Sequence, residues 1–189
     1  MYALCLARSL ALAALMAGAP VVAVAQSSDA STLSQEELMQ RFQRQKTRGL
    51  LLAPKPGTET ETAETTQTAE TTYVQVDPQD QVNIRISFDF DSAALRDDEK
   101  PKLTTLCDAM KAMDGQVFRI VGHTDSAGSA SYNENLSKLR AEEVKRFMVG
   151  SCGIAAEMLQ TVGAGESFPV NEADPRADEN RRVEFQALS

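Results

Sequence analysis

Apolar and polar residues follow a regular pattern mainly from about residue 81 to the end of the chain. Val82, Ile84, Ile86 and Phe88 alternate with polar residues, as in a strand with one buried face. Apolar residues at helical or strand spacing continue through the rest of this segment. The predicted elements, in the order βαβαββ, are strands at 82–88, 116–121, 159–162 and 182–187 and helices at 98–113 and about 134–150.

This order of elements predicts a two-layer α+β domain over residues 81–189. Each helix separates two strands that can lie in the same sheet, so both helices are expected on one face. The polar alternation of the first and last strands predicts that the other face stays partly exposed to solvent. A segment of this length is one ordinary domain and is expected to fold alone.

Residues 1–25 have the composition of a secretory signal peptide. A basic residue, Arg8, precedes the apolar run 10–16, and small residues end the segment at 23–25. The run is rich in alanine and falls short of the roughly 20 strongly apolar residues that a spanning helix needs. We therefore expect export and no transmembrane segment after signal removal. Retention of the segment as an anchor is the alternative.

Two segments of different composition lie between the signal and the domain. Residues 26–53 form an N-terminal arm with one candidate helix, signalled by Ser34 and Glu37 at the spacing of a capping box. Residues 54–80 are rich in threonine and glutamate, and such a segment cannot bury a core. We expect a partly ordered arm and a disordered linker that lets the domain reach some tens of ångströms from the N-terminus.

Charge and cysteine content exclude several classes of function. The formal charge is −8, and it becomes −9 when Arg8 leaves with the signal, which argues against nucleic acid or an anionic membrane as the main partner. Export leaves Cys107 and Cys152 as an even pair, either bonded as a disulfide or buried as thiols. With no CxxC pair and a single histidine, neither a metal site nor a cofactor is expected.

The run from Gly122 to Ala141 sets two opposite charges across a loop and a helix. Asp125 follows a predicted strand, and Arg140 lies near the apolar stripe of the helix. A charged side chain is rarely buried there unless it is paired. Helical side chains lean toward the N-terminus, so Arg140 is expected to point at the Asp125 loop. Asn133 is expected to cap the helix and to contact a ligand. The pattern suits a zwitterionic ligand, or else an ion pair between Asp125 and Arg140.

A catalytic interpretation of the same run is weaker. His123, Asp125 and Ser126 are close in sequence, but neighbouring side chains of an extended segment point to opposite faces. No nucleophile elbow GxSxG is present. We expect His123 to have a structural, hydrogen-bonding role, and we expect no enzyme activity.

Three motifs then resemble one family. They are FDFDSAAL at 88–95, IVGHTDSAGSASYNENLSKLRAEEV at 120–144 and NRRVEF at 180–185, and in this order they are similar to the OmpA-like C-terminal domain. The resemblance covers nearly all of residues 81–189. It implies a mixed four-stranded sheet with helices on one face. It also implies noncovalent binding of peptidoglycan through the meso-diaminopimelate of the stem peptide in a Gram-negative envelope.

The resemblance also implies roles for particular residues. Asp125 would hold the amine of diaminopimelate and Arg140 its carboxylate. Thr124, Asn133 and Asp91 match positions that line the family pocket, and Arg181 and Arg182 match the NRRVE signature, where a structural or rim role is expected. The loop before this signature departs from the family pattern, so no role is carried over to Arg176.

The function expected from these observations is that of a periplasmic protein that binds the cell wall, at the inner face of the outer membrane. Residues 34–53 are the candidate contact with an envelope protein partner. One alternative is a structural component of a larger envelope assembly that acts mainly through its N-terminal arm. A less favoured one is a wall-remodelling enzyme using Asp89 and Asp91.

Overall fold

The structure is a computed structural model that describes residues 29–52, 73–89 and 92–188, with side chains only to Thr47 in the first range. The predicted signal peptide and Asp91 lie outside the described residues. Among the residues that are described, no helix is long and apolar enough to cross a membrane.

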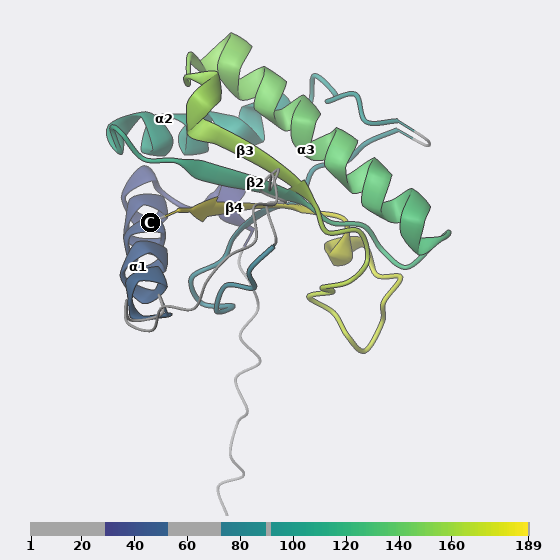
Figure 1. Cartoon of the computed structure of the whole chain (residues 1–189). Coiled ribbons are helices and arrows are strands. Elements are labelled where there is room, and N and C mark those ends of the chain that lie inside the picture. The colour runs from purple at the N-terminus through teal and green to yellow at the C-terminus, as the bar shows by residue number, and fades with distance from the viewer. Residues whose placement is uncertain (1–28, 53–72, 90–91, 189) are drawn as a thin grey trace, which may run out of the picture.

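The domain is a mixed four-stranded sheet with its strands in the order β1-β4-β2-β3 (Figure 1). β2 pairs in parallel with β3, and β4 pairs antiparallel with both β1 and β2. This architecture confirms the predicted α+β fold. The strands are β1 (Val82–Ile84), β2 (Phe118–Gly122), β3 (Leu159–Gly163) and β4 (Val183–Ala187), and the helices are α1 (Gln35–Leu52), α2 (Thr104–Ala112) and α3 (Ala130–Cys152).

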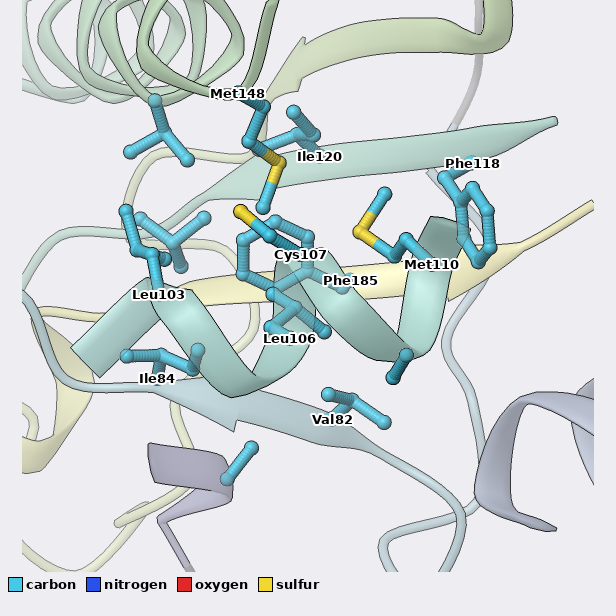
Figure 2. Close-up of a cluster of buried hydrophobic side chains, with 14 of the residues drawn as sticks. Val82, Ile84, Leu103, Leu106, Cys107, Met110, Phe118, Ile120, Met148 and Phe185 are labelled. Carbon is cyan, nitrogen blue, oxygen red and sulfur yellow. The ribbon is translucent and has the colours of Figure 1, made fainter. Parts of the chain in front are cut away.

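One face of the sheet carries the hydrophobic core. Figure 2 shows Leu106 and Met110 of α2 pointing between strand residues such as Phe118 and Phe185. Met148 of α3 belongs to the same buried cluster. Both helices therefore pack on one face, as predicted, because their apolar stripes match the inward-facing residues of the strands.

Several element boundaries differ from the prediction. β1 ends at Ile84 because only three of its residues pair with β4, so Ile86 and Phe88 lie beyond the strand. The helix predicted from residue 98 starts as a 3-10 turn, Lys100–Leu103, and becomes α-helical only at Thr104. Pro101 lies in this turn, where its missing N–H leaves no helical hydrogen bond unmade.

The N-terminal arm is more ordered than the composition predicts. Leu38 and Phe42 of α1 are fully buried in the core, and the Phe42 ring meets the Phe118 ring edge to face at 5.1 Å. The Gln45 amide donates to the Asp80 carbonyl and accepts from the Ala187 N–H at 2.7 Å. α1 is thus part of the folded body (Figure 1), because its apolar positions find a partner surface that the local sequence does not reveal.

The end of the predicted linker also belongs to the folded body. The Gln186 amide donates to the Val74 carbonyl at 2.8 Å, and the Gln81 amide donates to the Val76 carbonyl at 2.9 Å. Residues 73–76, called the strap below, therefore lie on the sheet. Residues 54–72 of the predicted linker lie outside the described residues.

The face of the sheet opposite the core is buried over β1 and β4. Asn83, Glu184 and Gln186 are each no more than 5% exposed. At β1 and β4 the expectation of a partly solvated face was wrong. Glu184 and Gln186 hydrogen-bond to the strap and to each other, and Asn83 bonds to Gln81 and Arg182. The face is partly exposed only toward β3, at Arg119 and Gln160.

A disulfide joins Cys107 of α2 to Cys152 at the end of α3, with the two Cα atoms 5.8 Å apart. The two helices that cover the core face are thus linked covalently across 45 positions of sequence.

Candidate functional site

Two glycines let α3 lie directly on the ends of β2 and β3. A Cβ on Gly122 would fall 2.0 Å from the Ser137 carbonyl oxygen, and one on Gly163 would fall 2.5 Å from that of Glu134. Neither approach leaves room for a side chain. The loop that follows β2 is therefore held against the first half of α3, which brings the Asp125 loop close to the helix that carries Arg140.

Asp125 is held in place by two hydrogen bonds to its carboxylate. Oδ1 accepts from the backbone N–H of Ala127 at 2.9 Å, in the manner of an Asx turn. Oδ2 accepts from Nη1 of Arg181 at 2.7 Å, and the Asp125 side chain is 14% exposed. Each carboxylate oxygen has two lone pairs, so the group can accept further donors from the solvent side.

Arg140 is half-buried beside this loop. Its Nε donates to the Ser92 carbonyl at 3.4 Å, and its guanidinium carbon lies 4.6 Å from the centre of the Phe88 ring. Burial lowers the pKa of Arg140, and the nearby Arg181 cation lowers it further, while Asp125 opposes both. Within the described ranges its guanidinium forms no ion pair. The carboxylate of Asp125 pairs with Arg181, so the predicted alternative of an Asp125–Arg140 pair is not what the structure has.

Asn133 holds two loops together. Its side chain is buried, and its amide nitrogen donates to the Asp125 carbonyl at 3.3 Å and to the Glu166 carboxylate at 2.5 Å. The prediction that Asn133 caps α3 was wrong. Ser129 is the cap and accepts from the Tyr132 N–H, because the helix begins at Ala130, four residues earlier than predicted.

Thr124 precedes Asp125 and is also buried. Its backbone N–H donates to the Gly165 carbonyl at 2.8 Å. Its Oγ1 has no hydrogen-bond partner among the described residues, and a buried hydroxyl without a partner is uncommon. Of the predicted site residues, the structure thus brings Thr124, Asp125 and Asn133 together in one loop and helix start, with Arg140 on the same helix.

His123 has a structural position. Its ring is buried, and Nε2 lies 3.2 Å from Oε2 of Glu184. Burial lowers its pKa, so the neutral imidazole is favoured. It faces the strap side of the sheet, away from a ligand site at the Asp125 loop.

Arg181 and Arg182 are adjacent in the sequence, but they bind different partners in the structure. Arg181 binds the carboxylates of Asp125 and Asp178, and these contacts, that of Asp125 foremost, raise its pKa. Arg182 is buried, and its Nε donates to the side chain of Asn83. Both residues precede β4, and neighbouring side chains of an extended segment point to opposite sides. The direct contact of Arg181 with Asp125 was not predicted.

The site therefore presents one carboxylate and two guanidinium groups at one end of the sheet. The Asp125 carboxylate can accept from an ammonium, and Arg140 can donate two parallel hydrogen bonds to a carboxylate. The arrangement suits a ligand that carries both charges close together.

Several known proteins are similar to this chain. A model of the OmpA family matches residues 87–182. Outer membrane porin F of Pseudomonas aeruginosa is 36% identical over 108 residues, which are 56% of this chain and 31% of porin F. The peptidoglycan-associated lipoprotein of Legionella pneumophila is 31% identical over 100 residues, which are 52% of this chain and 56% of the lipoprotein.

Among solved structures, the peptidoglycan-associated lipoprotein from Burkholderia pseudomallei is 29% identical, with a TM-score of 0.46 over 54% of this chain and 87% of its own. The chain spans about a third of porin F and about half of the Legionella lipoprotein. The family model alone matches just over half of the chain. On that match, the chain belongs to the OmpA family.

Proposed function

We propose that this protein binds peptidoglycan noncovalently and that the free end of diaminopimelate is the group it recognises. The ammonium of that end would bind the Asp125 carboxylate, and the carboxylate on the same carbon would bind Arg140. Each is a charge-assisted contact, worth roughly 1.5–3 kcal/mol.

The observation that carries this proposal is the state of Arg140. A half-buried cation on a helix, with no ion pair among the described residues, costs free energy unless an anion compensates it. The Ser92 carbonyl and the Phe88 ring orient the guanidinium without neutralising its charge. A ligand carboxylate would supply the missing negative charge.

The remaining predicted residues support the site in different ways. Thr124 is buried directly before Asp125, and its backbone N–H bonds to the Gly165 carbonyl, so it holds the start of the site loop. The amide group of Asn133 donates to the Asp125 carbonyl and the Glu166 carboxylate, so its contribution is mainly to position the loop. Asp91 lies outside the described residues and stays a proposed ligand contact; it directly precedes Ser92 in the sequence, whose carbonyl accepts from Arg140.

The relatives support a place in the cell envelope. The Legionella relative is named a peptidoglycan-associated lipoprotein and the Pseudomonas relative an outer membrane porin. We place this protein in the periplasm, bound to the wall, acting by binding and not by catalysis. Contact with an envelope partner through residues 34–53 is less favoured, because α1 buries Leu38 and Phe42 against its own domain.

Co-sedimentation of the mature protein with purified diaminopimelate-containing sacculi tests the proposal. Asp125→Ala and Arg140→Ala should each weaken binding by about 10- to 100-fold, since each removes one charge-assisted contact. The matched control is Arg146→Ala on the same helix, whose side chain is 78% exposed, and it should bind as the parent does.

The ligand offers a second control. Wall fragments with lysine in place of diaminopimelate keep the ammonium and lack the carboxylate, so they should lose the Arg140 contact and bind more weakly. Folded Asp125→Ala and Arg140→Ala variants that sediment like the parent would overturn the site assignment.

A further inference from the structure

Tyr73, the first residue of the strap, makes contacts that no site prediction included. Its hydroxyl donates to Oε2 of Glu184 at 2.9 Å. Its ring meets the His123 ring edge to face at 5.5 Å and the Phe168 ring at 4.5 Å. It lies outside residues 87–182, the range that the family model matches.

These contacts join Tyr73 to three segments that carry the proposed site. His123 is two positions before Asp125 and is bound by the same Glu184 oxygen that accepts from Tyr73. Phe168 lies two positions after Glu166, the residue that binds the Asn133 amide. The third segment begins with Arg181, the ion-pair partner of Asp125.

Arg182 completes the connection between these segments. Its carbonyl accepts from the His123 N–H at 2.9 Å, and its Nη2 donates to the Phe168 carbonyl at 3.1 Å. All three segments therefore meet beneath one tyrosine ring, on the side of the sheet away from the helices. A shift of that ring would displace His123, and the two residues of backbone between His123 and Asp125 would pass the displacement to the Asp125 carboxylate.

We propose that Tyr73 is a positioning residue for the ligand site, so that the strap sets the affinity for the wall peptide. This inference rests on the proposed function. The physical reason is that Glu184 is fully buried, and its carboxylate requires donors from several sides. Loss of the Tyr73 hydroxyl removes one donor, and loss of the ring uncovers His123, which directly precedes the site loop.

Two substitutions in the full mature chain test the proposal. Tyr73→Phe removes the hydrogen bond to Glu184 and keeps the ring, and it should weaken binding of diaminopimelate-containing muropeptides by about two- to tenfold. Tyr73→Ala also removes the ring and should weaken binding further. Val74→Ala, at a neighbouring side chain that is 60% exposed, should leave binding unchanged.

A matched destabilising control separates positioning from general loss of stability. Gln45→Ala removes hydrogen bonds that anchor α1 to Asp80 and Ala187, which are not part of the site. It should lower the unfolding temperature and leave affinity unchanged well below that temperature. If Gln45→Ala loses affinity in step with Tyr73→Phe at equal stability, the positioning role is refuted.

Hydrogen exchange in the ligand-free protein gives a readout that does not depend on wall binding. The Thr124 N–H bound to Gly165 and the Ala127 N–H bound to Asp125 should exchange faster in Tyr73→Phe and Tyr73→Ala than in the parent. Unchanged exchange at both amides would overturn the inference. A parent protein that fails to bind sacculi, with faster exchange in the variants, would instead refute the proposed function alone.

Discussion

Both faces of the sheet are buried over β1 and β4, but the side chains on the two faces are of opposite character. The core face carries residues such as Val82, Ile120 and Phe185 under α2 and α3. The opposite face, called the strap face here, carries Glu184 and Gln186 under residues 73–76, with the buried Asn83 on the neighbouring strand. Apolar burial stabilises without regard to direction, whereas the polar face requires each donor to meet an acceptor. We therefore expect the core face to contribute most of the free energy of folding. The hydrogen bonds of the strap face should fix the positions of its side chains more exactly.

This contrast matters because the strap face lies next to the ligand loop. His123 and Arg182 extend their side chains into the strap face, while their sequence neighbours Thr124 and Arg181 belong to the site. Hydrogen bonds have narrow ranges of distance and angle, so this network constrains the loop more tightly than apolar packing would.

The largest expected effect is a loss of stability from a substitution on the core face. Phe42→Ala should lower the free energy of unfolding by about 3–5 kcal/mol, because the ring is fully buried against Phe118. Urea unfolding of the mature protein measures it, with exposed Gln43→Ala as the control. A cost under about 1 kcal/mol would mean that α1 is not part of the core.

The disulfide between Cys107 and Cys152 also contributes to the stability of the core face. Replacing Cys107 and Cys152 with serine should cost about 2–4 kcal/mol, because the bond closes a long loop in the unfolded chain. Urea unfolding with and without reductant should show the same loss for the parent. Titration of denatured mature protein that finds two free thiols would contradict the bond.

A substitution on the strap face should cost less. Glu184→Gln removes the buried charge that Tyr73 and His123 share, with an expected loss of about 1–3 kcal/mol. Glu142→Gln, on the exposed side of α3, is the control. A loss as large as that of Phe42→Ala would contradict the division of roles between the two faces.

The smallest expected effect is a dependence on pH that comes from His123. Glu184 and Arg182 of β4 and Tyr73 of the strap face this ring. Burial lowers the pKa of the folded histidine below its ordinary 6.5, so the unfolded chain takes up the proton first. Stability is then full above pH 6.5 and falls as the pH drops toward the folded pKa. Between pH 7.5 and 5.5 the loss is at most about 1.4 kcal/mol.

Urea unfolding at the two pH values measures this loss, and His123→Asn should abolish the part of it that belongs to the histidine. A parent that becomes more stable at pH 5.5 than at pH 7.5 would show that the buried ring is protonated in the folded protein.

The sequence predicted the order of the helices and strands better than the residues at which they end. The alternation at Val82 and Ile84 and the helical spacing of Val144 and Met148 reflect which side of an element is buried, so order and fold class followed from them. The ends of elements did not follow, because the end of β1 depends on how many residues β4 offers for pairing.

The covering of the strap face could not be predicted. Alternation of polar residues such as Glu184 and Gln186 is typical of a solvated face. Only the folded chain brings Tyr73, 111 positions away from Glu184, to its carboxylate. In the same way the composition of the N-terminal arm does not reveal that Phe42 meets Phe118.

The residues of the candidate site could be predicted from the sequence, but the contacts between them could be predicted less well. Spacing and helix direction placed Asp125 and Arg140 near one another, and the structure adds that Arg181 occupies one side of the Asp125 carboxylate. An ion pair between residues 56 positions apart leaves no periodic signal. The burial of Asn133 behind the loop is likewise a property of the close approach of α3 to β2 and β3.

A crystal of the mature protein soaked with diaminopimelate tests the central claim most directly. The account predicts an ammonium within about 2.7–3.2 Å of the Asp125 carboxylate and the adjoining ligand carboxylate at the same range from the Arg140 guanidinium. Diaminopimelate bound with these charges reversed, or bound away from both residues, would contradict it.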